Sequence, residues 1–116
     1  MQEIKQIMNY IQSIAEYNKI SKEELGVLFY FSTVTCNVGE ALESKVEKML
    51  QEHFPKIPMY FVDTNALAEL AAQNSVFVVP TVLVYFDGKE TIRKSRNIGV
   101  SELGASIERL YNILFE

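Results

Sequence analysis

Cys36, the one cysteine of the chain, is the residue whose type and position most directly suggest chemistry. It follows an apolar run over residues 27–31 and precedes an amphipathic helical pattern. A thiol at such a junction lies near a helix N-terminus, where unpaired N–H groups and the helix dipole favour an anion. That environment lowers the pKa of a thiol and makes it a better nucleophile. Because a single cysteine forms no intrachain disulfide, a redox cycle at Cys36 needs a second thiol from another molecule.

Length and composition favour one domain and exclude some classes of function. The 116 residues, 48% of them hydrophobic, suffice for a domain that buries its core without a metal or disulfide. The net charge of −4 argues against a basic nucleic-acid binder, and no apolar stretch approaches a membrane span. The first residues lack the features of a secretory signal, and a lone free cysteine suits a reducing compartment. We therefore expect a single cytoplasmic domain over residues 1–116.

The elements that would position Cys36 follow from the periodicity of apolar residues. In chain order they are a helix over residues 1–20, a strand over 27–31, a helix that ends before Pro55, a strand over 57–62, a helix over 66–73, strands over 81–86 and 91–98, and a last helix capped by Ser101. Asp87 and Gly88 form a two-residue hairpin signal between the last two strands. Ser21 and Glu24 have the spacing of a capping box, but Gly26 follows so soon that we expect only a turn there.

This order of elements predicts an α/β domain. Two strands joined by a helix pair in parallel through a right-handed crossover, and the closing hairpin adds two antiparallel strands. The economical arrangement is a mixed four-stranded sheet flanked by helices on both faces. Residues 1–20 would form the N-terminal helix, and residues 26–116 would form the core of the domain.

The layout and a few marked positions resemble the thioredoxin-like family. Cys36 corresponds to the first cysteine of the family's Cys-x-x-Cys motif, and Val79-Pro80 corresponds to the family's cis-proline and the residue before it. Further matches are Thr81 after the proline, Asp87 and Gly88 in the hairpin, and Gly99 before the last helix. The resemblance implies a thioredoxin-like fold with a cis peptide bond before Pro80. Because residues 1–20 look helical, it also implies that the family's first strand is absent.

The sequence departs from the family at positions that bear on function. The motif consists of Cys36, Asn37, Val38 and Gly39. Gly39 stands where the resolving cysteine would be, so the motif is a monothiol Cys-x-x-Gly. Thr35 replaces the tryptophan usual before the first cysteine. Tyr30 occupies the position of a buried aspartate that moves protons to and from the second cysteine, so the loss of the aspartate agrees with the loss of that cysteine.

The resemblance implies monothiol thiol–disulfide chemistry in cell redox homeostasis. Cys36 would be the nucleophile and the site of mixed-disulfide formation. Thr35, Val79 and Pro80 would form the rim that binds a partner chain through main-chain hydrogen bonds. The partners would be protein substrates or low-molecular-weight thiols, and a disulfide between two copies would give a homodimer. No metal or organic cofactor is needed, only an external thiol as reductant.

Two other functions stay open, and with them the question whether the chain is an enzyme. Gly39 and Glu40 favour a redox-inactive module that binds a protein in the groove beside Pro80. Glu40 and Glu43 also place negative charge near a forming thiolate, so we expect the pKa of the thiol to fall only mildly. The third function is a sensor whose Cys36 is modified reversibly by a small thiol.

The other chemistry-bearing residues favour structural roles. His53 is excluded as a catalytic partner of Cys36, because the helix between them would separate the two by about 25 Å. Asp63 would cap a helix, since no second metal ligand lies at a suitable spacing. Basic residues on the last strand would protect a sheet edge from pairing with another chain. These residues are Arg93, Lys94 and Arg96.

Overall fold

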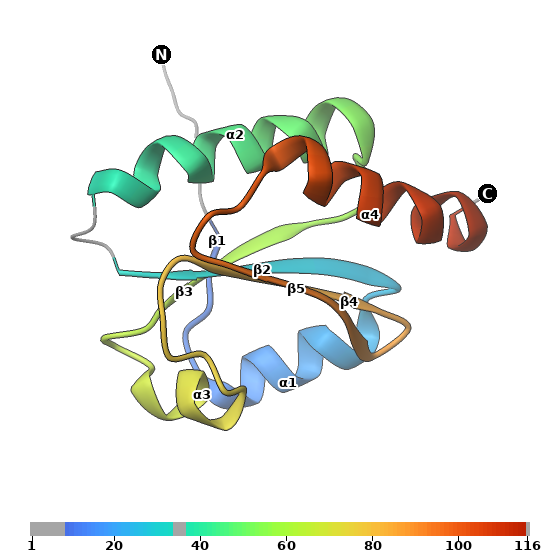
Figure 1. Ribbon diagram of the computed structural model, residues 1–116. Coiled ribbons are helices and arrows are strands. Elements are labelled where there is room, and N and C mark those ends of the chain that lie inside the picture. The colour runs from blue at the N-terminus through green and yellow to red at the C-terminus, as the bar shows by residue number, and fades with distance from the viewer. Residues whose placement is uncertain (1–8, 34–36, 116) are drawn as a thin grey trace, which may run out of the picture.

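Within residues 9–33 and 37–115, which the computed structural model describes, the chain forms a five-stranded sheet flanked by helices (Figure 1). For residues 37–41 only the backbone is described. The elements are β1 (Asn9–Tyr10), α1 (Ile14–Glu23), β2 (Gly26–Ser32), α2 (Asn37–His53), β3 (Met59–Asp63), α3 (Ala68–Gln73), β4 (Thr81–Phe86), β5 (Lys89–Ser95) and α4 (Val100–Leu114).

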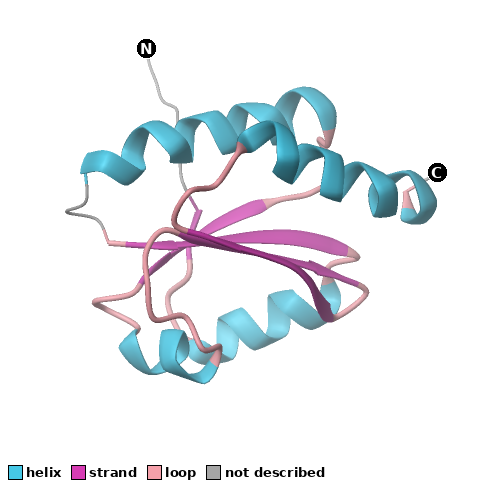
Figure 2. Cartoon of the chain, in the orientation of Figure 1, coloured by secondary structure: helices cyan, strands magenta, loops and turns pink. Residues whose placement is uncertain are grey.

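The sheet has the strand order β1-β3-β2-β4-β5, with β2 in the middle. β3 is parallel to both of its neighbours, whereas β4 is antiparallel to both β2 and β5. α2 and α4 cover one face of the sheet, and α1 and α3 cover the other (Figure 2). The predicted α/β class, with a mixed sheet between helices, is therefore confirmed.

Strand β2 is buried on both faces, as its continuous apolar run predicts. Its side chains alternate between two apolar clusters. Leu28 and Tyr30 belong to the cluster beneath α2 and α4, whereas Phe29 and Phe31 belong to the cluster beneath α1 and α3. Both clusters therefore pack on β2, one on each of its faces.

The sheet has five strands among the described residues rather than the predicted four, because a short first strand lies at its edge. Asn9 and Tyr10 pair in parallel with Tyr60 and Phe61 of β3. Ile11 continues the pairing, since its N–H donates to the Phe61 carbonyl at 2.9 Å. The prediction that the family's first strand is absent was therefore wrong. Two residues of strand leave almost no periodicity in the sequence, and their pairing with β3 decides their conformation.

Helix α1 begins and ends later than predicted. Ser13 is its N-cap, because its side-chain oxygen accepts a hydrogen bond from the N–H of Glu16 at 3.1 Å. The Glu16 carboxylate in turn accepts one from the N–H of Gln12 at 2.6 Å. Such reciprocal bonds satisfy the free N–H groups of a helix start. The helix continues through Ser21, where only a turn was predicted. Residues 1–8 of the predicted helix lie outside the described residues.

The C-terminal elements agree with the sequence except at their boundaries. The hairpin turns at Asp87 and Gly88, whose φ angles of 54° and 79° suit a two-residue hairpin turn. β5 ends at Ser95, earlier than predicted. Helix α4 has Gly99 rather than Ser101 as its N-cap residue.

No helix in the described part of the chain is long and apolar enough to cross a membrane. In residues 9–33 and 37–115, no group of three His, Cys, Asp or Glu side chains could hold a metal ion.

Candidate functional site

Three chain segments meet at one end of the sheet, where β2 and β3 end and β4 begins, and two of them carry the predicted site. At the end of β2, Phe31 pairs with Thr81 at the start of the antiparallel β4. Ser32 pairs with Asp63 at the end of the parallel β3. The chain therefore leaves β2, in the direction of Cys36, beside the point where the predicted cis-proline leads into β4. The strand register brings two distant parts of the sequence to the same end of the sheet.

The described residues include part of the predicted site. Val79 and Pro80 lie at this end of the sheet, and the peptide bond between them is cis, as the resemblance implied. The first turn of α2 is formed by Asn37, Val38 and Gly39, for which the backbone is described. Thr35 and Cys36 lie outside the described residues, so their roles stay predictions.

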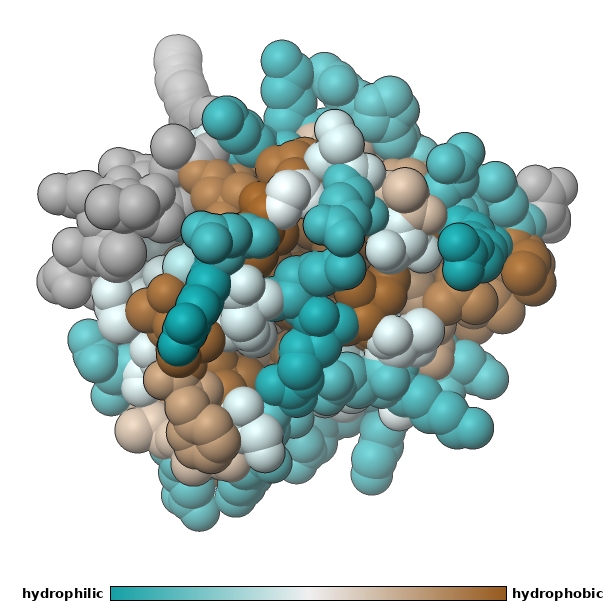
Figure 3. Space-filling view, viewed as in Figure 1, coloured by the Kyte–Doolittle hydropathy of each residue, from teal (hydrophilic) through white to brown (hydrophobic). Residues whose placement is uncertain are grey.

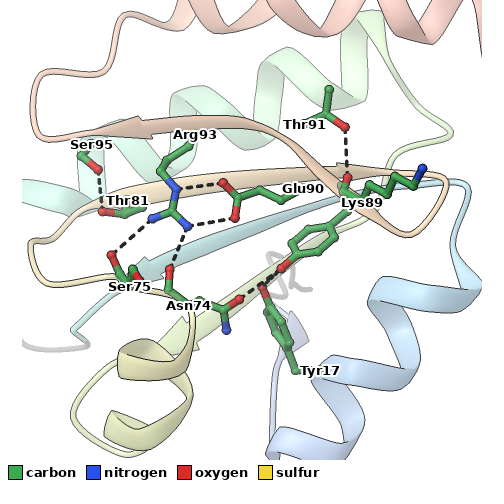
Figure 4. Close-up of polar contacts among 10 residues, drawn as sticks. Tyr17, Asn74, Ser75, Thr81, Lys89, Glu90, Thr91, Arg93 and Ser95 are labelled. Carbon is green, nitrogen blue, oxygen red and sulfur yellow. Dashed lines mark hydrogen bonds and ion pairs between the residues drawn. The ribbon is translucent and has the colours of Figure 1, made fainter.

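The Thr81 hydroxyl positions the backbone just before β4. It is buried and donates a hydrogen bond to the carbonyl of Val78 at 2.8 Å. The hydroxyl oxygen of Ser95, on β5, lies 3.0 Å from that of Thr81 (Figure 4). Because the single proton of Thr81 goes to Val78, Ser95 must be the donor of this second bond. The hairpin thus holds the segment that contains the cis bond.

The backbone of Val79 bears on the predicted binding of another chain. The N–H of Arg96 donates to the carbonyl of Pro80 at 3.0 Å, so the carbonyl of the residue after Val79 already has a partner. The N–H and C=O of Val79 have no hydrogen-bond partner among the residues that the structure describes. An extended peptide could therefore bond to Val79 in the manner of an added strand.

A hollow beside Val79 exposes apolar side chains. It measures about 290 Å³ and is lined by Thr64, Ala68, Ala71, Ala72, Val76, Phe77 and Val79. Phe77 is 78% exposed, the largest fraction among the exposed large hydrophobic residues of the described chain. Apolar groups gather on the surface over the segment between α3 and β4 (Figure 3). Sequence analysis did not single out Phe77, which lies in a run of apolar residues over 76–79.

Sequence analysis also missed Ser32 at this end of the sheet. The side-chain oxygen of Ser32 is buried at the end of β2 and has no hydrogen-bond partner within the described residues. Such groups are rare in folded proteins, because a buried hydroxyl without a partner lowers stability. Polar groups left without partners tend to occur at functional sites, which agrees with a site at this end of the sheet.

A chain of hydrogen bonds supports the segment before the cis bond from the opposite side. The hydroxyl of Tyr17 donates to that of Tyr85 at 2.9 Å, and Tyr85 donates to the side-chain carbonyl of Asn74 at 3.2 Å (Figure 4). The Asn74 amide group donates to the carbonyl of Leu70 at 3.0 Å. Burial raises the pKa of Tyr17, and the hydrogen bond that it donates to Tyr85 raises it further.

We expect the protein to lose stability as pH rises above about 10. Unfolded tyrosines ionise there, whereas Tyr17, with its raised pKa, keeps its proton in the folded state. The folded state then binds more protons, so the free energy of unfolding falls with pH. Tyr17→Phe should flatten this decline by up to about 1.4 kcal/mol per pH unit and cost about 1 kcal/mol at pH 7. Urea unfolding between about pH 7 and pH 11 tests this, and parallel curves for the two proteins would contradict it.

Among the other candidate residues, His53 and Lys94 lie on the predicted elements, whereas Arg96 follows the end of β5 instead of lying on that strand, and Asp63 caps a different element. His53 is the last residue of α2 and is exposed. Lys94 lies on the edge strand β5 and forms an ion pair with Glu102 at 3.8 Å. Asp63 accepts a hydrogen bond from the N–H of Asn65 at 3.0 Å. It therefore caps the turn that precedes α3 rather than the helix itself, whose N-cap residue forms no side-chain cap.

Comparisons with known proteins agree with this architecture. The family model described as Thioredoxin matches residues 9–109. The thioredoxin-like protein YdfQ of Bacillus subtilis is 27% identical over 106 residues, which cover 91% of this chain and 94% of that protein. Mitochondrial thioredoxin O of Oryza sativa is 32% identical over 76 residues, 64% of this chain and 43% of that protein. The structure of Fasciola hepatica thioredoxin matches with a TM-score of 0.76 and 27% identity, covering 88% of this chain and 98% of that one.

Proposed function

The chain belongs to the thioredoxin family and is at that level a thioredoxin-like redox protein, and we propose that it acts in thiol–disulfide exchange through Cys36 alone. One observation carries this proposal. The strand that leads toward Cys36 and the segment that contains Val79-Pro80 meet at one end of the sheet, with Phe31 opposite Thr81. A disulfide substrate lying along Val79 would thus be near the end of β2, whose last residue, Ser32, precedes Cys36 by four positions.

The proposed reaction is a pair of thiol–disulfide exchanges. The Cys36 thiolate attacks one sulfur of a substrate disulfide, forms a new S–S bond and expels the other sulfur as a thiolate. Since Gly39 supplies no second thiol, an external thiolate then attacks the mixed disulfide and releases Cys36. A second external thiol completes the reduction, so two external thiols supply the two electrons and end as their own disulfide. No metal or organic cofactor takes part.

The proposed partners are extended protein segments or low-molecular-weight thiols. A peptide would form main-chain hydrogen bonds to Val79, and an apolar side chain next to its cysteine would enter the hollow beside the exposed Phe77. Thr35 and Pro80 would complete the rim of the binding site. A reducing compartment such as the cytoplasm suits a protein with one free cysteine. A disulfide between the Cys36 residues of two copies would form a homodimer when no reductant is present.

Alkylation of Cys36 with iodoacetamide between about pH 4 and pH 10 tests the proposal. We expect the rate to show an inflection below the free-thiol value of about pH 8.5, because the helix N-terminus near the start of α2 stabilises a thiolate while Glu40 and Glu43 oppose it. Cys36→Ser is the control and should show no labelling. An inflection at about pH 8.5 or above, or labelling only after unfolding, would contradict the proposal.

The contrary result would favour a redox-inactive module, whose specific support is the combination of Gly39 with the exposed hollow around Phe77. In that case a peptide should bind equally well to the wild type and to Cys36→Ser. A sensor differs from both, since its low-pKa thiol would accept a small-thiol modification but would not turn over a protein disulfide.

A further inference from the structure

We infer that Arg93 is a positioning residue that fixes the partner-binding segment over residues 74–80. This inference rests on the proposed function, in which Val79 and Phe77 of that segment contact the partner. The sequence predicted Arg93 only as a charge that protects the sheet edge. Its side chain instead reaches from β5 to the end of α3 and contacts the start of this segment (Figure 4).

The guanidinium group of Arg93 makes four hydrogen bonds. Nη2 donates to the carbonyl of Asn74 at 2.7 Å, and Nη1 donates to the carbonyl of Ser75 at 3.3 Å. Nε and Nη2 also donate to the two carboxylate oxygens of Glu90, both at 2.8 Å. Glu90 therefore orients the guanidinium plane, and the opposite part of that plane binds the backbone 18 and 19 residues away in sequence.

The two carbonyls that Arg93 binds lie where α3 ends and the chain reverses. Asn74 is the C-cap residue of α3, and Ser75 has a φ of 56°, a left-handed value that is uncommon for a residue other than glycine. The last carbonyls of a helix lack partners within the helix, and a cation placed there also suits the helix dipole. Arg93 thus stabilises the turn that sends Val76 into the core and leaves Phe77 exposed.

Residues of β5 and its C-terminal extension contact both ends of the segment. Arg93 binds its first two carbonyls, Ser95 donates to the Thr81 hydroxyl that holds the Val78 carbonyl, and Arg96 N donates to Pro80. The part between these contacts contains Val79, whose N–H and C=O have no partner among the described residues. A segment fixed at both ends loses less conformational entropy when a partner binds, so its affinity rises without any new contact.

Lysine cannot replace arginine in this role. Its ammonium is a compact charge without the planar fork of donors, so it cannot bind two carbonyls and both oxygens of Glu90 in the same way. Arg93→Lys therefore keeps the charge of the edge strand while removing the fixed geometry. Lys94→Gln is a matched control, because it removes a cation next along β5 that pairs with Glu102 rather than with residues 74–80.

The test compares two disulfide probes that release the same thionitrobenzoate on attack by Cys36. One is the symmetrical disulfide of thionitrobenzoate, and the other is its mixed disulfide with a short peptide that carries one cysteine among valine and leucine residues. For Arg93→Lys we expect an unchanged rate with the small probe and a rate about fivefold or more lower with the peptide. Lys94→Gln should behave as the wild type with both. Equal rates of wild type and Arg93→Lys with the peptide, or an equal loss with both probes, would overturn the inference.

Amide hydrogen exchange separates this inference from the proposed function. In Arg93→Lys we expect exchange of the hydrogen-bonded amides of Asn74, Ser75 and Val76 to be about fivefold or more faster, while the core strand β2 exchanges as in the wild type. Glu90→Gln should change the same amides in the same direction, because Glu90 orients Arg93. If wild-type Cys36 reacts with neither probe, the proposed function fails, and the exchange of the amides of residues 74–76 still decides the inference. Unchanged exchange there would overturn the role of Arg93 whatever the reactivity of Cys36.

Discussion

Replacing Phe29 by alanine is expected to lower the free energy of unfolding by about 4 kcal/mol. Phe29 lies in the central strand and is fully buried in the cluster beneath α1 and α3. Its ring centroid lies 4.2 Å from that of Tyr17, 5.6 Å from Tyr85 and 6.0 Å from Tyr60. The substitution removes these contacts and leaves a cavity that the surrounding rings cannot fill. Because small domains have total stabilities of about 5–15 kcal/mol, urea unfolding should show a large loss.

Phe77→Ala is the matched control for this prediction. It makes the same chemical change at a side chain that is 78% exposed, so the free energy of unfolding should change by less than about 0.5 kcal/mol. The control has a second use, since the proposed function predicts weaker binding of an apolar peptide by Phe77→Ala. A loss below about 2 kcal/mol for Phe29→Ala, or equal losses in the two variants, would contradict the packing described for β2.

The parts of the fold that the sequence predicted are those with strong local patterns. β2 and β4 have apolar residues at nearly every position, so their burial on both faces follows from the sequence. The turn at Asp87-Gly88 needs left-handed φ angles that these residue types tolerate. These strands and this turn bring Val79-Pro80 to the end of β2, so the location of the candidate site followed with them.

The features that the sequence could not predict depend on contacts between distant residues. β1 is two residues long and owes its conformation to pairing with β3. Ser13 and Ser21 both have glutamate three residues later, and only the start of α1 shows which of them is the cap. The same holds at the site, where an exposed Phe77 and an inward-reaching Arg93 look like ordinary members of an apolar run and a charged edge strand.

Tyr30→Asp is expected to destabilise the protein by about 5 kcal/mol or more at pH 7. Tyr30 is fully buried in the cluster beneath α2 and α4, and its ring stacks on Phe61 at a centroid distance of 6.0 Å. Aspartate would leave a cavity and place a carboxyl group among apolar side chains. The substitution introduces the aspartate that the resemblance to thioredoxins implies for this position. It therefore tests whether the surroundings of residue 30 could still hold a charged group.

The pH dependence identifies the cause of that loss. Burial raises the pKa of an aspartate above its ordinary value of about 3.9, so at intermediate pH the folded variant keeps a proton that the unfolded chain has lost. Its stability should therefore fall by up to about 1.4 kcal/mol per pH unit above about pH 4, and a variant unfolded at pH 7 should regain helical circular dichroism on acidification. Tyr30→Asn is the matched control, with nearly the same cavity and no added charge that titrates. Equal stabilities of the two variants from pH 4 to pH 7 would contradict the prediction, because they would show that this site can hold a carboxylate.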